Sequence, residues 1–229
     1  MKNLILVPLL FLAVLTSAQS NYQINSLMEF MRVNKMAVGE KRYITSEADI
    51  QGSPYLDDEF IAGSVYTTTK FQYNDIPLRY NIYSDNVEFK TPDNTVLAIA
   101  SPETIEKITF GGNTIEYIPY INVKKERNGY FLLASKGKAS LYIRPEVIYK
   151  KPTVAEAYKD PEPAKFERRN DVFFIRIGTQ AAQRIEKKKD LTEVFPDHQK
   201  EIESFVKKNK TSPDKLDELT SLIAYYNSL

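Results

Sequence analysis

The chain has 229 residues, with 31 basic and 30 acidic side chains, one histidine and no cysteine. This balance argues against a nucleic-acid binder, which usually carries a basic excess, and against a polybasic membrane-surface protein. The missing cysteine excludes disulfides, thiolate metal sites and cysteine nucleophiles. The length allows one sizeable hydrophobic core, or one core with a small satellite.

Residues 1–18 predict a secretory signal peptide. A lysine precedes an apolar run from Leu4 to Leu15, and small residues at 16–18 precede Gln19. The run is well short of the roughly 20 residues that cross a bilayer. The sequence therefore predicts export to the periplasm, the outer membrane or the extracellular space, with no membrane span in the mature chain.

Residues 19–150 predict an antiparallel β domain. Leu78, Tyr80 and Ile82 alternate with polar residues, as in a half-buried strand. Asn128-Gly129 predicts a hairpin turn, because both residue types tolerate a positive φ. Similar strands and turns recur at the spacing of an all-β fold. The predicted fold class is mainly β, with an antiparallel meander that forms a sandwich or a partly open barrel.

The C-terminal part has a different character. Residues 151–168 contain three prolines among charged residues, which predicts a linker or a strap over the sheet. Residues 169–229 predict a small α+β region, with a strand pair at 172–185 and three short helices from about 188 to 228. The predicted domains after the signal peptide are therefore 19–150, 151–168 and 169–229.

The sequence contains no motif that assigns a reaction. His198 is the single histidine, and its neighbours carry no nucleophile signature, so we expect a surface role for it. No P-loop and no glycine-rich dinucleotide motif occurs. We therefore expect no catalytic, cofactor-binding or metal-binding residues and no cofactor.

The candidate interaction surface is the turn at 52–59, where Gly-Ser-Pro predicts an irregular backbone. Its candidate contact residues are one tyrosine and three acids: Tyr55, Asp57, Asp58 and Glu59. A tyrosine beside carboxylates offers a partner both stacking area and charge. In the alternative interpretation, residues 54–56 plug the end of the sheet core and the acids are merely solvated.

Several stretches carry a family resemblance. They are residues 52–60 (GSPYLDDEF), 76–83 (IPLRYNIY) and 87–89 (VEF), together with the C-terminal residues 191–197, 202, 205–209 and 225–229. These stretches resemble a small secreted family common in Bacteroidetes, and the resemblance covers most of the mature chain. It implies export and a shared architecture. The family has no established activity, so the resemblance implies no site residues.

The sequence predicts an exported, non-catalytic binding or interaction protein of the bacterial cell envelope. We expect a protein or polymer partner and no nucleic acid. The alternative is a carboxylate-based hydrolase acting on an envelope or extracellular polymer, because acid pairs follow no spacing rule in sequence. Such an enzyme needs a cleft in which two carboxyl groups face each other, about 5–10 Å apart.

Overall fold

The computed structural model describes residues 22–31, 50–153 and 162–229. The predicted signal peptide at 1–18 lies outside these residues, as do residues 154–161. None of the helices in the described ranges has the length together with the apolar character that crossing a bilayer would take.

The described residues form two compact units. The first unit contains residues 22–31, Tyr55–Asn81 and Asn86–Gly112, and the second contains residues 50–54, Ile82–Asp85 and Asn113–Leu229 with the gap at 154–161. The predicted division at residues 150 and 169 stays a prediction.

The first unit is built on antiparallel strands in the order β5-β1-β2-β3-β4. Its elements are β1 (Ile61–Thr67), β2 (Gln72–Asn81), β3 (Asn86–Lys90), β4 (Val96–Ala98), the short 3₁₀ helix η2 (Pro102–Thr104) and β5 (Ile105–Phe110). The alternation predicted for β2 is confirmed, because Leu78 and Tyr80 are buried. A helix at 22–31 belongs to this unit, and the ring of its Phe30 lies 6.1 Å from that of Tyr73 in β2.

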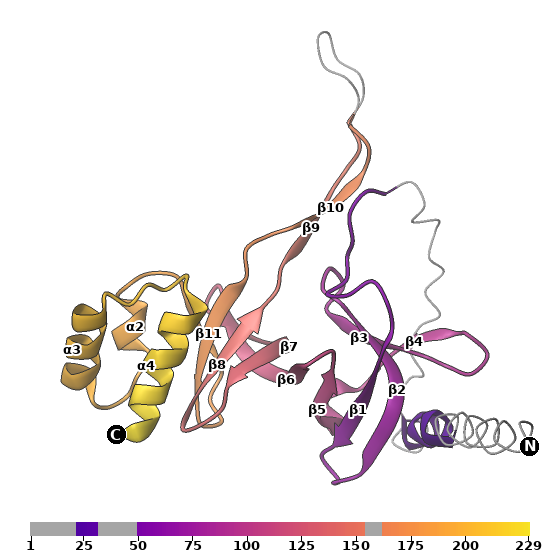
Figure 1. Ribbon diagram of the computed structural model, residues 1–229, viewed down its shortest axis with the longest axis horizontal. Coiled ribbons are helices and arrows are strands. Elements are labelled where there is room, and N and C mark those ends of the chain that lie inside the picture. Colours follow the sequence, from indigo (N-terminus) through magenta and orange to yellow (C-terminus); the bar gives the residue numbers. More distant parts are fainter. Residues whose placement is uncertain (1–21, 32–49, 154–161) are drawn as a thin grey trace, which may run out of the picture. The chain divides into compact units, whose positions relative to one another are not determined.

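The second unit is built on strands in the order β12-β11-β8-β7-β6, with a separate ribbon of β9 and β10 (Figure 1). The strands are β6 (Asn113–Asn122), β7 (Lys125–Ser135), β8 (Ala139–Arg144), β9 (Val147–Lys150), β10 (Lys165–Arg168), β11 (Val172–Ile177) and β12 (Gln183–Ile185). The strand pair predicted at 172–185 is confirmed as β11 and β12. Part of the predicted linker, Lys165–Arg168, forms β10 and pairs with β9.

Within the second unit the strands curl until β6 meets the chain just before β12. Tyr120 in β6 and Ala182, just before β12, form an isolated parallel bridge. The Ile121 N–H donates to the Ala182 carbonyl at 2.9 Å, and the Ala182 N–H donates to the Pro119 carbonyl at 2.8 Å. A single bridge leaves the sheet open rather than closed into a barrel.

Two hydrophobic clusters lie on the two faces of the curled sheet, because successive side chains of a strand point to opposite faces. Phe174 packs with Tyr120 and Phe131 in one cluster, and its neighbours Phe173 and Ile175 belong to the other. The first cluster includes both bridge residues and therefore lies inside the curl. The second lies under the C-terminal helices.

Three short helices follow the strand pair, as predicted, and the first and last of them cover the outer face of the sheet while the middle one packs against the other two (Figure 1). They are α2 (Asp190–Glu193), α3 (Gln199–Asn209) and α4 (Leu216–Ser228). The apolar stripe of α4 is buried from Leu219 to Tyr226, whereas Leu216 at its start is exposed, and Asn227 fixes the end of the helix. The Asn227 side chain accepts from the Ala139 N–H at 2.8 Å and donates to the Ala139 carbonyl at 2.9 Å. The predicted fold class, mainly antiparallel β followed by a strand pair and short helices, is confirmed.

The hairpin turn predicted at Asn128-Gly129 is wrong. Both residues lie inside β7 and pair with β6. The β6–β7 turn is formed by Val123 and Lys124, whose φ angles are 46° and 65°. The local preference of Asn-Gly for a turn is therefore overridden by the tertiary structure.

Position 129 requires a glycine because a side chain there would clash with its neighbours, and not because the backbone needs a positive φ. A Cβ atom at this position would lie 2.8 Å from Asp85 Oδ2 and 3.0 Å from Arg144 Nη1. It would also lie 3.3 Å from the ring of Tyr120. The missing side chain lets the ion pair of Asp85 and Arg144 approach the β7 backbone.

Asp197 provides a test of how α4 is anchored. Its carboxylate accepts from the Tyr226 hydroxyl at 2.6 Å and from Lys138 Nζ at 3.1 Å, and these bonds lower the pKa of Asp197 below its ordinary value of 3.8. Because folding lowers this pKa, the contribution to stability is complete above about pH 4 and is lost as the pH falls through the folded-state value. In an NMR titration we expect Tyr226→Phe to raise the pKa of Asp197. An unchanged pKa would contradict the contact.

Candidate functional site

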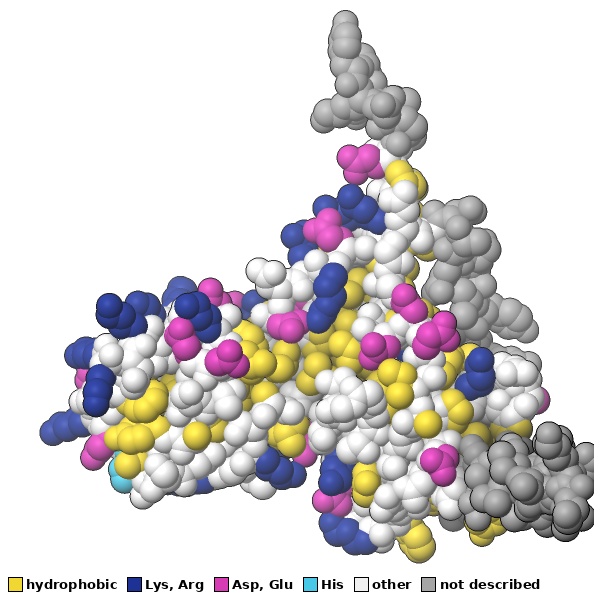
Figure 2. Space-filling model, in the orientation of Figure 1, with side chains coloured by type: hydrophobic (Ala, Val, Ile, Leu, Met, Phe, Trp, Pro, Cys, Tyr) yellow, Lys and Arg dark blue, Asp and Glu magenta, His cyan; other side chains and the backbone are white. Residues whose placement is uncertain are grey.

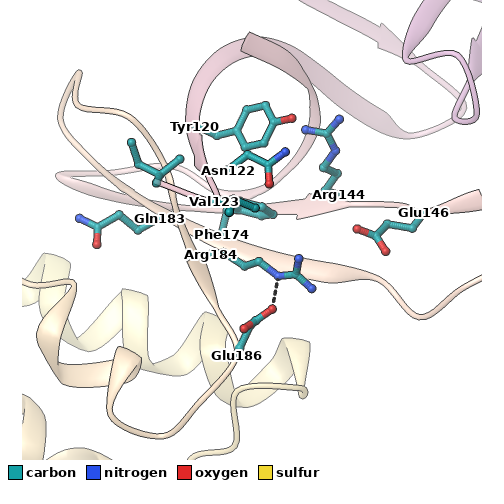
Figure 3. Close-up of a pocket in the computed structure, with 10 residues that line it drawn as sticks. Tyr120, Asn122, Val123, Arg144, Glu146, Phe174, Gln183, Arg184 and Glu186 are labelled. Carbon is teal, nitrogen blue, oxygen red and sulfur yellow. Dashed lines mark ion pairs between the residues drawn. The ribbon is translucent and has the colours of Figure 1, made fainter. Parts of the chain in front are cut away.

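A pocket of about 510 Å³ opens in the second unit, where the pairing between β6 and β12 stops. Figure 3 shows the side chains that line it, with those of Tyr120, Asn122 and Arg144 above those of Gln183, Arg184 and Glu186. The lining residues are Tyr120, Ile121, Asn122, Val123, Arg144, Glu146, Phe174, Gln183, Arg184 and Glu186.

The floor of the pocket is aromatic and belongs to the hydrophobic cluster inside the curl. Tyr120 and Phe174 are buried, and their ring centroids lie 5.7 Å apart in an edge-to-face arrangement. Phe174 also packs edge to face on Phe131, at 4.9 Å. Such pairs add about 0.5–1.5 kcal/mol beyond the area that they bury. The floor is therefore a preformed apolar surface.

Arg144 forms one wall of the pocket, and its position is fixed from two sides. Its guanidinium carbon lies 4.5 Å from the ring centroid of Tyr120, and its Nη2 atom lies 3.1 Å from Asp85 Oδ2. Asp85 in turn accepts from the Tyr130 N–H at 3.3 Å. Both side chains of the pair are mostly buried, so water screens their attraction less than at an open surface. The wall therefore presents a fixed cation.

The rim of the pocket is exposed and carries both charge signs. The Nε atom of Arg184 lies 2.7 Å from Glu186 Oε1, and about half of each side chain is exposed. Gln183 is also exposed. On the opposite rim Val123 is 90% exposed. A surface ion pair of this kind contributes little to stability. Arg184 and Glu186 can therefore leave each other to contact a ligand with little loss of free energy.

Glu146 and Glu186 are the two carboxylates of the pocket. A carboxylate hydrolase would need such a pair, with one acid kept protonated by an apolar environment. Glu186 is instead ion-paired and solvent-exposed. Of the described residues that line the pocket, none is a histidine, a serine or a lysine. Within the described ranges no cluster of three or more metal-ligating side chains occurs.

Tyr55 lies in the first unit, against β2. The guanidinium carbon of Arg79 lies 3.6 Å from the Tyr55 ring centroid. Arg79 also donates to the Asp58 carbonyl at 3.1 Å and to the Glu88 carboxylate at 2.9 Å. Tyr55 is half-buried. These contacts give the tyrosine a packing role at this turn.

The three acids of the turn are exposed. Asp57, Asp58 and Glu59 all present their side chains to solvent beside the packed tyrosine. The structure brings Tyr55 and Asp58 together at Arg79. A role of this surface in binding a partner stays a prediction.

The remaining sequence candidate, His198, lies at the start of α3. It is half-buried, and its ring centroid lies 6.5 Å from that of Tyr226. It does not line the pocket.

Sequence reasoning missed Tyr120, Arg144 and Arg184. These residues lie on three different strands and belong to no common motif. Only the curl of the sheet brings them to one pocket. The single local signal is Gly129, which marks close packing beside Arg144, although the Asn-Gly pair at 128–129 predicts a turn.

Comparison of the chain with protein-family models, with curated proteins and with solved structures finds no match.

Proposed function

We propose that this chain is an exported, non-catalytic binding protein of the bacterial cell envelope, and that the pocket between β6 and β12 is its binding site. The observation that carries the proposal is a preformed aromatic floor beside a fixed arginine, under an exposed polar rim. Ligand sites in proteins typically combine an apolar concavity with a few polar groups that set orientation.

Export and the Bacteroidetes family belong to the same proposal and rest on the sequence. The support is the signal-peptide pattern at 1–18 and the stretches that resemble the secreted family. The mature protein then acts in the periplasm, at the outer membrane or outside the cell, on a protein or polymer partner. Intact-mass measurement of natively expressed protein should place the N-terminus near Gln19. A product that retains residues 1–18 would contradict export.

The binding site can be tested by photo-crosslinking in intact cells. We expect a photoreactive amino acid at Gln183, on the pocket rim, to give a specific adduct with an envelope component. The matched control is Lys200, an exposed residue that lines a surface depression on α3. Filling the pocket with Asn122→Trp should abolish the adduct at 183. Equal adducts from both positions, or none from 183, would contradict the proposed site.

The carboxylate hydrolase is kept as the second candidate because Glu146 and Glu186 line one pocket. It predicts hydrolysis of an envelope polymer that is lost in both Glu146→Gln and Glu186→Gln. The binding proposal predicts that these variants change affinity and that the wild-type protein turns over no polymer.

A further inference from the structure

One edge of β12 carries backbone groups that face the pocket. The N–H and C=O of Ala182 both bond to β6. Backbone groups alternate in direction along a strand, so those of Gln183 face β11, where Gln183 lies opposite Ile175. The N–H and C=O of Arg184 therefore point away from β11 and toward the pocket, as those of Ala182 point toward β6. In the described residues the β6–β12 pairing is limited to the Tyr120–Ala182 bridge, so β6 does not pair with Arg184.

The edge of β6 that faces β12 also has an open backbone group, next to the bridge at Tyr120. The Ile121 N–H bonds to Ala182, and its C=O points to the same side of the strand. Because the bridge is parallel, the next rung of the ladder would join the Arg184 N–H to the Ile121 carbonyl. The pocket occupies the place of that rung, since both residues line it.

We propose that this pocket binds an extended peptide segment of a partner protein as an added β-strand, paired with the backbone of Arg184. The inference rests on the proposed function and names its ligand class. Strand addition draws affinity from main-chain hydrogen bonds and specificity from pockets for alternate side chains. Here every second side chain of the peptide lies on Tyr120 and Phe174, so the segment carries apolar residues at alternate positions.

The backbone of Val123 has a positive φ, which supports the inference. A positive φ is unfavourable for a β-branched residue, and glycine or asparagine would form this turn without strain. Strained residues of this kind cluster at functional sites. Val123 lines the pocket and is 90% exposed, so its side chain has little packing role in the unliganded protein. It supplies apolar contact area to the bound segment.

The probe is the blocked peptide acetyl-Thr-Val-Thr-Val-Thr-amide, titrated into the full mature chain by ¹H–¹⁵N NMR. We expect saturable shifts at Ile121, Val123 and Arg184. Two matched control peptides carry N-methyl groups either on both valines or on the outer threonines. In a strand these positions donate from opposite edges. We expect one N-methylated peptide to bind at least tenfold more weakly and the other to bind like the parent.

The outcomes separate this inference from the proposed function. Equal binding of all three peptides would overturn backbone pairing. Absence of saturable binding by the parent peptide would overturn the peptide class. In either case, the proposed function stands if crosslinking from position 183 succeeds. A glycan adduct at 183, together with no peptide binding, would assign the pocket to a polymer.

Val123→Gly provides an independent variant. We expect the substitution to raise Tm by about 2–4 °C, because the strained φ is relieved, and to weaken peptide binding at least threefold. The control is Lys124→Gly, which relieves a similar φ but does not line the pocket. It should change Tm and leave peptide affinity unchanged. Equal affinities for both variants and the wild type would overturn the role of Val123.

Discussion

Replacing Tyr226 by alanine is expected to lower the free energy of unfolding by about 3–5 kcal/mol, as for truncation of a fully buried aromatic side chain. Tyr226 is 0% exposed, and its ring centroid lies 4.4 Å from that of Phe195. Its hydroxyl donates to Asp197 at 2.6 Å. The substitution leaves a cavity between α4 and the sheet and removes this bond.

Two variants locate the cause of that loss in urea unfolding. Tyr226→Phe keeps the ring and should cost about 1 kcal/mol for the lost hydrogen bond. Tyr225→Ala removes the neighbouring ring, which is only partly buried and stacks on Phe205 at 4.5 Å. Tyr225→Ala should therefore lower the free energy of unfolding by less than Tyr226→Ala does. The opposite order would show that α4 does not pack as described.

Gly129→Ala should lower the free energy of unfolding by about 1–3 kcal/mol, the usual cost of overpacking. The added methyl group would lie 2.8 Å from Asp85 Oδ2 and 3.0 Å from Arg144 Nη1. Relief requires one of these side chains to move, which weakens a mostly buried ion pair.

The control for Gly129→Ala is Asn128→Ala, at the exposed adjacent position of β7. It should change the free energy of unfolding by less than about 0.5 kcal/mol. Because Arg144 forms a wall of the pocket, Gly129→Ala should also weaken binding, whereas Asn128→Ala should not. A neutral effect of Gly129→Ala on both stability and binding would contradict the close packing at Gly129.

Much of the fold could be predicted from local periodicity. The alternation around Leu78 and Tyr80 indicated β2. An apolar stripe from Leu216 to Tyr226 indicated α4, in which Leu216 alone of the stripe is exposed. These signals suffice because a strand or helix shows its buried face directly in the sequence. The Asn128-Gly129 turn failed because glycine serves two purposes. It permits a positive φ, and it also permits the close approach needed beside Arg144.

The pocket could not be predicted in this way. Tyr120, Arg144 and Arg184 meet only because the sheet curls and joins Tyr120 to Ala182. A contact between two strands that are separated by other strands in the sheet leaves no pattern in either strand. The turn at Val123 likewise contradicts local preference, and such conflicts are expected at functional sites.

Native-state hydrogen exchange of the unliganded chain tests the central claim most directly. We expect the Ile121 and Ala182 amides to be protected, because they form the two bonds of the bridge. We expect the Arg184 amide to exchange much faster than those of its neighbours Gln183 and Ile185, because it faces the pocket. Protection of the Arg184 amide equal to that of the Ile121 amide would mean that the β6–β12 ladder continues. The backbone of Arg184 would then not be open to an added strand. Rapid exchange at Ile121 and Ala182 would mean that the sheet does not curl.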